Sequence, residues 1–357
     1  MYKSLINNTI TSYIDIAMTQ RCIELARKYQ RNVFKNPTVG AIVVCENRII
    51  GEGAHEFYGQ GHAEVNAINS VQKEDEYLLK KSVIYVTLEP CFHHGKTPPC
   101  VALILEKKIP RVVISCVDPY EKVAGRSIEL LRANGVEVVV GVLEKEGLDL
   151  IRPFVVNTFQ GRPYVILKYA QSADGFIGKK NEQVWLTNSF SKHLVHKWRS
   201  ECDGILVGRN TVMVDNPSLT NRLYFGKNPT RVVIDRQLKI TAEKAIFDTA
   251  APSIFFNEKK EEKQTLHRYI KVDFNQSVLP TILRRLLEEG ISKLIVEGGA
   301  ETIQNFVNAN LWDEARVFYT SKMINDGIKS PELRNALLVE EHNIKDDNLK
   351  VFYRSII

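Results

Sequence analysis

The chain contains 357 residues, a length that accommodates two or three domains of ordinary size. Hydrophobic residues make up 44% of it, which is normal for globular domains with buried cores, and no apolar run approaches the roughly 20 residues needed to cross a bilayer. With 48 Lys and Arg against 42 Asp and Glu, the net charge of +6 is only mildly basic and lacks the clustered basic segment typical of nucleic-acid binders.

The first half of the chain alternates helical and strand patterns. Residues 1–11 are expected to be a frayed leader. Because polar residues interrupt the apolar ones over residues 1–16, no signal peptide is expected there, which predicts a cytoplasmic protein. Apolar spacing predicts helices over 15–29, 62–70, 100–107 and 127–134. Apolar and β-branched runs predict strands at 39–44, 48–53, 83–88, 111–117 and 136–140. This alternation predicts an α/β layered domain with a largely parallel sheet.

The alternation restarts after a candidate boundary between residues 146 and 161, so we expect one domain over 13–150 and a second over 160–357. In the second half, helices are predicted over 189–200, 278–289 and 302–309. Strands are predicted at 164–170, 204–207, 231–235, 253–256, 293–297, 314–319 and 349–352. The second domain is therefore also expected to be α/β.

Two of the six cysteines stand apart from the others. Cys45 and Cys116 lie in apolar strands and Cys22 in a helix, so all three are expected in the core, and Cys202 is given no role. Cys91 and Cys100 instead follow the sequence His62-Ala63-Glu64, so one histidine and two thiols supply the three protein ligands of a catalytic zinc site.

Glu64 fits the chemistry of such a site. Bound zinc lowers the pKa of its water toward about 7, and hydrolytic deamination also needs a group that carries a proton to the departing ammonia. A glutamate two residues beyond a histidine ligand, at the start of a helix, can face the same water without binding the metal. The pattern therefore predicts His62, Cys91 and Cys100 as zinc ligands and Glu64 as the catalytic proton carrier.

The spacing of the cysteines leaves two other interpretations open. Eight residues separate Cys91 from Cys100, whereas the general deaminase pattern has two. The site can instead be a structural zinc centre closed by His93 or His94, or the two cysteines can be unrelated.

Four segments of the first half resemble the bacterial bifunctional riboflavin biosynthesis deaminase–reductase, whose own pattern has the long insert between the cysteines. They are Asn-Pro-Thr-Val-Gly at 36–40, His-Ala-Glu-Val at 62–65, Thr-Leu-Glu-Pro-Cys at 87–91 and His-His-Gly-Lys-Thr-Pro-Pro-Cys at 93–100. The resemblance extends over nearly the whole chain after residue 13. It implies a cytidine-deaminase-like three-layer domain that removes the 2-amino group of a diaminopyrimidinone ribosyl phosphate.

The resemblance also implies substrate contacts for Asn36, His93, Lys96 and Asp118. Asn36 can instead be interpreted as a turn residue before a proline, and Lys96 as a solvated loop lysine. The chain departs from the family after Asp118, where Tyr120 stands in place of an asparagine, and at Ser127, where the family has glycine.

The second half carries its own glycine signal. The turn at Gly298 and Gly299 joins a strand to a helix whose N-terminal amides suit a phosphate, although Gly-Gly turns are also common for structural reasons. No Gly-x-Gly-x-x-Gly follows the first strand, so the Rossmann fingerprint is absent.

By resemblance this half is the family's dihydrofolate-reductase-like, NADPH-dependent domain, which reduces the ribosyl group to ribityl. The segments that carry the likeness are Lys168 with Ser-Ala-Asp-Gly at 172–175, Trp-Leu-Thr at 185–187, Thr-Val at 211–212, Asp-Asn-Pro-Ser-Leu-Thr at 215–220 and Val-Glu-Gly-Gly at 296–299. The implied NADPH contacts are Ala170, Trp185, Thr211, Asp215, Gly298, Gly299, Ala300 and Thr302. The implied substrate contacts are Gln183, Arg199, Leu219, Arg222 and Glu297, with Gln183 replacing the family's usual serine.

Lys168, Asp215 and Glu297 are the candidates for proton transfer or electrostatic help in reduction. Lys168 is equally interpreted as a structural or phosphate-binding lysine, and Trp185 as core packing. Arg236 stands where the family often has serine near the cofactor, and it is left unassigned.

The partners follow from these assignments. We expect a small phosphorylated pyrimidine substrate, zinc and NADPH, no nucleic acid, no membrane, and a homodimer or larger assembly through the reductase domains. The alternatives are a nucleic-acid-binding deaminase-like protein, a zinc-stabilised scaffold without catalysis, and a chain that retains only one activity.

Overall fold

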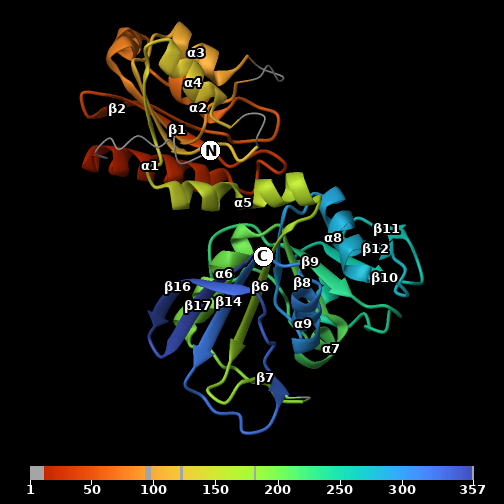
Figure 1. Cartoon of the computed structure of the whole chain (residues 1–357). Coiled ribbons are helices and arrows are strands. Elements are labelled where there is room, and N and C mark those ends of the chain that lie inside the picture. The colour runs from red at the N-terminus through yellow and green to blue at the C-terminus, as the bar shows by residue number, and fades with distance from the viewer. Residues whose placement is uncertain (1–11, 93–97, 121–123, 181, 356–357) are drawn as a thin grey trace. The chain divides into compact units, whose positions relative to one another are not determined.

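The computed structural model describes residues 12–92, 98–120, 124–180 and 182–355 of the chain. The chain forms two compact units that divide between Phe159 and Gln160 (Figure 1). Within the described residues, no helix is long and apolar enough to span a membrane.

The first unit contains the elements of one α/β domain. In chain order they are α1 (Tyr13–Tyr29), β1 (Gly40–Cys45), β2 (Arg48–Ala54), α2 (Ala63–Asn69), the 3₁₀ helix η2 (Lys73–Lys81), β3 (Val83–Leu88), α3 (Cys100–Glu106), β4 (Arg111–Cys116), α4 (Arg126–Ala133), β5 (Glu137–Val140) and α5 (Glu144–Gln160).

The sheet of this unit has the order β2-β1-β3-β4-β5. The strands β3, β4 and β5 are parallel, as expected, but β1 runs antiparallel to both of its neighbours. The prediction of a largely parallel sheet is therefore wrong for the two pairs that β1 forms with β2 and β3. The cause is a two-residue hairpin at Glu46 and Asn47, whose positive φ values of 49° and 64° are those of a type I′ turn without its usual glycine.

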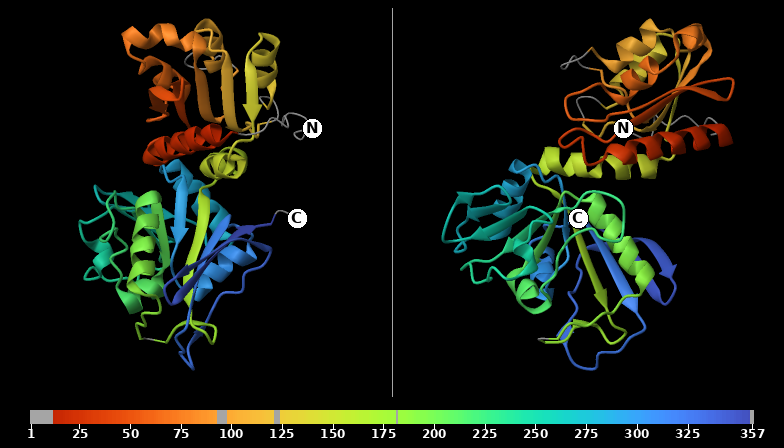
Figure 2. Two further views of the ribbon diagram at one scale, coloured as in Figure 1. Left: turned by 90° about the vertical axis from the view of Figure 1, so that its left-hand side faces the viewer. Right: turned by 180° about the vertical axis from the view of Figure 1, so that it is seen from behind.

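Helices cover both faces of this sheet (Figure 2). Ala41 and Val43 pack with α2, α3 and α4 on one face, whereas Ile42 and Val44 pack with α1 on the other. Alternate residues of one strand thus enter two cores, which explains the continuous apolar run of β1. The unit is the expected three-layer α/β domain.

The second unit begins with β6 (Tyr164–Gln171). It continues with β7 (Phe176–Gly178), α6 (Ser189–Glu201), β8 (Gly204–Gly208), α7 (Arg209–Asp215), β9 (Thr230–Ile234), the 3₁₀ helix η3 (Ala245–Phe247), β10 (Ser253–Asn257), β11 (Glu262–Lys263), β12 (His267–Lys271), α8 (Val278–Glu288), β13 (Lys293–Val296), α9 (Ala300–Asn308), β14 (Glu314–Thr320), β15 (Ile328–Lys329), β16 (Ala336–Ile344) and β17 (Asp347–Arg354).

One large sheet organises this unit, in the order β11-β12-β10-β9-β8-β13-β6-β14-β17-β16. The strands from β12 to β14 in this order are parallel, and antiparallel strands complete both edges. Helices α8 and α9 pack on one face through Leu283 and Phe306. Helix α6 packs on the other, where the rings of Trp198 and Phe318 lie 5.5 Å apart. In an open parallel sheet of this kind, ligands bind outside the carboxyl ends of the strands.

Candidate active sites

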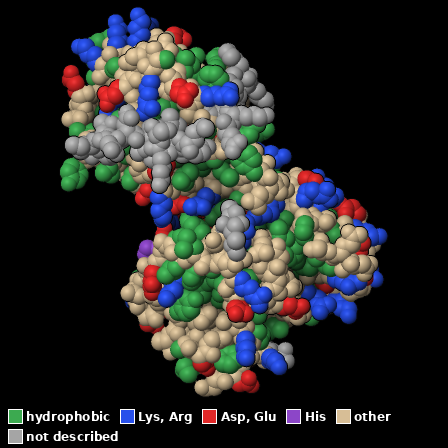
Figure 3. Space-filling view, in the orientation of Figure 1, with side chains coloured by type: hydrophobic (Ala, Val, Ile, Leu, Met, Phe, Trp, Pro, Cys, Tyr) green, Lys and Arg blue, Asp and Glu red, His purple; other side chains and the backbone are tan. Residues whose placement is uncertain are grey.

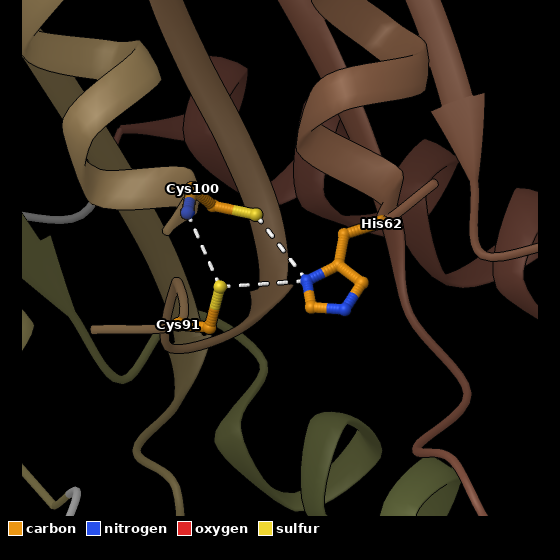
Figure 4. A group of neighbouring side chains, drawn as sticks. All are labelled: His62, Cys91 and Cys100. Atoms are coloured by element: carbon orange, nitrogen blue, oxygen red, sulfur yellow. Dashed lines mark hydrogen bonds between the residues drawn. The ribbon is translucent and has the colours of Figure 1, made fainter. Parts of the chain in front are cut away.

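Three potential metal ligands converge in the first unit. The Nδ1 atom of His62 lies 3.4 Å from the sulfur of Cys91 and 3.4 Å from the sulfur of Cys100 (Figure 4). All three ligand atoms lie within 4.8 Å of one another. The sequence prediction of this ligand set is therefore matched by three side chains that point at one spot.

The local fold explains why these side chains meet. His62 is the N-cap of α2, Cys91 follows β3, and Cys100 opens α3. Helix α2 can lie close to the sheet because Gly53 has no side chain: a Cβ there would come within 2.3 Å of the Ala67 nitrogen. The backbone N–H of Cys100 donates to the sulfur of Cys91 at 3.1 Å, which holds the two cysteines together.

The donor set fits zinc. Bond lengths of about 2.0 Å to nitrogen and 2.3 Å to sulfur in a tetrahedral site place neighbouring ligand atoms about 3.5 Å apart. The two nitrogen–sulfur distances of 3.4 Å agree with that spacing. The side-chain hydrogen bond with Cys100 lowers the pKa of the Cys91 thiol, so a thiolate is readily available to a cation.

Glu64 lies on the first turn of α2, beside this group. It is 4% exposed, and burial raises the pKa of its carboxyl to about 7. Glu64, His62 and Cys91 line one cavity of about 250 Å³. A carboxyl that titrates near neutrality and faces a metal site is suited to both accepting and returning a proton.

Asn36 and Asp118, two of the predicted substrate contacts, line the same cavity. The Nδ2 atom of Asn36 lies 2.8 Å from Nε2 of His55, whose Nδ1 lies 3.0 Å from the carbonyl oxygen of Gly61. Since a carbonyl only accepts, Nδ1 of His55 carries the proton, and Nε2 accepts from the Asn36 amide. Burial lowers the pKa of His55, which favours this neutral form. Asn36 also closes a turn with Val33, which supports its interpretation as a turn residue, and its contact with the substrate stays a prediction.

His55 was not predicted from the sequence, because nothing near it in the chain indicates its role. His93 and Lys96 lie outside the described residues, so their predicted roles remain predictions.

A buried carboxylate, Glu89, organises the segment after Asp118. It accepts the backbone N–H groups of Asp118 at 3.2 Å, Gly125 at 2.9 Å and Ser127 at 3.2 Å, and the Ser127 hydroxyl at 2.6 Å. Helix α4 has Gly125 as its N-cap and no capping side chain of its own, so Glu89 supplies the missing acceptor. The hydroxyl of Ser127, at a position where glycine was expected, thus adds a fourth hydrogen bond to this carboxylate.

We expect Glu89→Gln to destabilise the first unit by about 2 to 4 kcal/mol, because an amide offers one acceptor oxygen where buried N–H groups need two. Far-UV circular dichroism in denaturant would measure the loss. The matched control is Glu129→Gln, an exposed residue of α4. All three tryptophans lie in the second unit, so their fluorescence transition reports on that unit. Equal stability of the two variants would remove the capping role from Glu89.

The second unit contains a larger cavity, of about 730 Å³. Six of the predicted cofactor contacts line it: Ala170, Trp185, Thr211, Asp215, Gly299 and Ala300. Gly298 and Thr302 are not among its lining residues, although a Cβ on Gly298 would come within 2.8 Å of Val207 and 3.0 Å of Thr211. Trp185 is 61% exposed, which excludes core packing as its role.

The N-terminus of α9 opens into this larger cavity at Gly299, which has a φ of 65° and is the N-cap of the helix. Free amides at a helix N-terminus favour phosphate groups. The lining therefore fits a dinucleotide with its phosphates against α9.

Three charged side chains that are largely buried contact one another in the lining of the larger cavity. Glu297 accepts from Arg199 through both carboxylate oxygens, at 2.8 Å each, and its Oε2 lies 3.6 Å from Nζ of Lys168. Burial alone would raise the pKa of the Glu297 carboxyl, but the two cations lower it to about 2. Burial lowers the pKa of the Lys168 ammonium. Glu297 is thus an anion that holds two cations in place.

A smaller cavity of about 220 Å³ adjoins the larger one. Lys168, Gln183, Arg199, Asp215 and Leu219 line both, and burial raises the pKa of the Asp215 carboxyl. Arg222 lines only the smaller cavity, as do two residues that were not predicted from the sequence, Lys192 and His196. The predicted substrate residues therefore gather beside the predicted cofactor residues.

Two family descriptions match the chain. Residues 13–116 match "Cytidine and deoxycytidylate deaminase zinc-binding region", and residues 163–346 match "RibD C-terminal domain". The matched regions contain the convergent ligand set and the larger cavity, respectively.

Individual proteins match over nearly the whole length. The chain is 35% identical to riboflavin biosynthesis protein RibD of Aquifex aeolicus, over 96% of this chain and 98% of that one. It is 39% identical to RibD of Bacillus amyloliquefaciens, over 87% and 85% of the two chains. The Thermotoga maritima crystal structure of a diaminohydroxyphosphoribosylaminopyrimidine deaminase/5-amino-6-(5-phosphoribosylamino)uracil reductase superposes with a TM-score of 0.83 at 36% identity, covering 96% and 99% of the chains.

Proposed function

The chain belongs to the RibD family of bifunctional riboflavin biosynthesis proteins, and from that premise we propose that it deaminates a diaminopyrimidinone ribosyl phosphate and then reduces the ribosyl group to ribityl with NADPH. The observation that carries the proposal is the convergence of His62, Cys91 and Cys100 beside Glu64 in one cavity. We assign deamination to residues 13–150 and reduction to residues 160–357.

In the deaminase site, the chain's own groups bind the ring and move one proton. Asn36, oriented by His55, and Asp118 hold the substrate in the cavity. Zinc, when bound by His62, Cys91 and Cys100, supplies a water activated at neutral pH. The Glu64 carboxylate takes the proton that this water loses and gives it to the leaving amino group, so that ammonia departs and a carbonyl replaces it.

In the reductase site, the chain positions two ligands against each other. NADPH, when bound, supplies the hydride. The cofactor residues hold it with its phosphates at the N-terminus of α9. Arg222 and Arg199 bind the substrate, and Lys168 or Asp215 supplies the proton that balances the hydride.

The distribution of charged side chains on the surface fits a protein that binds small molecules better than one that binds nucleic acid. On the face drawn in Figure 3, Lys and Arg side chains lie in small groups with Asp and Glu between them. A stripe of cations with interleaved aromatic rings would instead be expected for a single-stranded nucleic acid.

We place the protein in the cytoplasm, because the thiol ligands must stay reduced and all six cysteines are free.

We also propose a homo-oligomer formed through the reductase units. The edge strand β16 supports this, because its Leu337 and Leu338 side chains are 61% and 45% exposed. Light scattering that gives the mass of a single chain would contradict the oligomer.

Two assays with separate substrates test the proposed function. Purified protein should release ammonia from the diaminopyrimidinone ribosyl phosphate without NADPH. It should oxidise NADPH when given the deaminated compound, and then release no ammonia. Failure of either assay in a folded, zinc-containing preparation would remove that activity from the proposal.

Removal of zinc should separate the two activities. We expect Cys91→Ser to lose most bound zinc and nearly all deamination, because a serine hydroxyl is a poor ligand beside a thiolate. NADPH oxidation with the deaminated compound should stay within about twofold of the wild type, since its residues lie in the other unit. Atomic absorption and the two assays check this. Deamination without zinc would contradict the metal role.

A further inference from the structure

His196 is a buried histidine of the reductase unit that lies beside a cavity. It lies on α6, is 2% exposed, and lines the smaller cavity. Its Nδ1 atom lies 3.0 Å from the backbone nitrogen of Arg222. A backbone N–H can only donate, so Nδ1 is the acceptor and the ring proton sits on Nε2.

The charges around this ring keep it neutral. Lys192 and Arg199 act on it from its own helix, Arg222 from the loop that follows Thr220, and Glu297 from the position directly after β13. Burial, with the three cations, lowers the pKa of His196 to about 4. At neutral pH the ring is therefore neutral, with Nδ1 as the acceptor for Arg222 and Nε2–H as a donor that can serve a ligand in the cavity that His196 lines.

The same cavity contains cations that have no carboxylate partner among the described residues. Glu297 already holds Arg199 and Lys168. Lys192 instead lies over the ring of Trp185, at 4.5 Å, and Arg222 donates to the Thr220 hydroxyl at 3.0 Å. Two uncompensated cations beside a neutral N–H donor match the charge and hydrogen-bonding needs of a phosphate dianion.

We propose that His196 is a substrate-positioning residue of the reductase site, which anchors the backbone of Arg222 through Nδ1 and donates Nε2–H to the phosphate of the substrate, with Lys192 as the second cation. This inference rests on the proposed function, because it assigns the smaller cavity to the phosphorylated substrate and leaves the larger one to the cofactor. His196 takes no part in the transfer of the hydride.

Two amide substitutions separate the two roles of the ring. In His196→Asn, the side-chain oxygen can replace Nδ1 and keep the anchor on Arg222, but the donor is lost. In His196→Gln, the amide nitrogen can replace Nε2, but the anchor is lost. His196→Ala removes both. The matched control is His193→Ala, an exposed histidine of the same helix.

The kinetic test uses the deaminated compound and NADPH oxidation with the full chain. We expect His196→Ala to raise KM for this substrate about 10- to 100-fold, the loss typical of a hydrogen bond to a charged group, while kcat changes less than about threefold. The Asn and Gln variants should fall between alanine and the wild type. An unchanged KM in His196→Ala, or a fall in kcat alone, would overturn the proposal.

The direct test follows the ring by nuclear magnetic resonance of protein with ¹⁵N-labelled histidine, of which there are eight. We expect one neutral ring with its proton on Nε2 throughout pH 5.5–8, absent in the His196 variants. Addition of inorganic phosphate should shift its Nε2–H signal. A ring protonated on Nδ1, or no shift with phosphate, would overturn the proposal. If phosphate shifts the ring but the wild type does not reduce the compound, the proposed function fails while the phosphate site stands.

Discussion

Glu64→Gln should lower the rate of deamination about 10²- to 10⁴-fold, the contribution typical of a positioned proton carrier, while the protein keeps its zinc. The amide has nearly the shape of the carboxyl and leaves no cavity at a site that is 4% exposed, so the fold should be unaffected. An amide cannot accept the proton that the attacking water must lose. Ammonia release, followed with saturating substrate and measured alongside zinc content, gives the answer.

The control for this variant is Glu24→Gln, on the exposed side of α1. It should match the wild type in zinc content and in both activities. If Glu64→Gln keeps both its zinc and its deamination rate, Glu64 is not the proton carrier. If it loses zinc, Glu64 instead supports the ligands, and the proton path must run elsewhere.

Glu297→Gln should abolish most reduction and lower the stability of the second unit by about 3 to 5 kcal/mol. The carboxylate is the buried partner of both Arg199 and Lys168, and a buried cation that loses its partner is strongly destabilising. We expect reduction to fall at least about 10²-fold, because the two cations that frame the site would repel each other and move. Unfolding in denaturant, followed by tryptophan fluorescence, measures the loss of stability. The rate of NADPH oxidation measures the loss of reduction.

The same variant has a defined pH dependence. The pKa of Glu297 is lowered from 4.5 to about 2 in the folded protein, so its stabilising effect is complete above the ordinary value and is lost as pH falls toward about 2. The stability difference between wild type and Glu297→Gln should therefore shrink over that range. The control is Glu288→Gln, in α8 with a side chain 54% exposed, which should show no such difference. A difference that stays constant down to pH 2 would contradict the charge-based explanation.

The sequence predicted most of what depends on local pattern. The strand at 83–88 matches β3 residue for residue, and the helix at 278–289 differs from α8 by one residue. The ligand set was also accessible, because zinc chemistry restricts the residue types so strongly that His62, Cys91 and Cys100 stand out despite their spacing.

Elements and residues that depend on tertiary contacts were not predicted. Helix α5 was not predicted, because Gly147 and Pro153 interrupt the helical pattern of its sequence. The turn between β1 and β2 contains no glycine. The sequence therefore did not indicate a tight hairpin there, and the antiparallel direction of β1 was not predicted.

His55, Glu89 and His196 act through partners that are distant in sequence. Glu89 was part of a recognised motif, but its task appears only when the amides after Asp118 are seen to surround it. His196 occupies an ordinary core position of a helix, and its role depends on a loop 26 residues away. The roles of such side chains can be assigned only when their hydrogen-bond partners are known, because no sequence spacing links the side chains to those partners.

The central claim is that two sites on one chain act in a fixed order, and the most direct test gives the diaminopyrimidinone ribosyl phosphate and NADPH together to the wild type and to Glu64→Gln. We predict that the wild type oxidises one NADPH for each ammonia released, and that Glu64→Gln oxidises almost none from this compound but reduces the deaminated compound at the normal rate. If Glu64→Gln oxidises NADPH from the diaminopyrimidinone as fast as the wild type does, reduction does not depend on deamination, and the proposed order of the two sites is wrong.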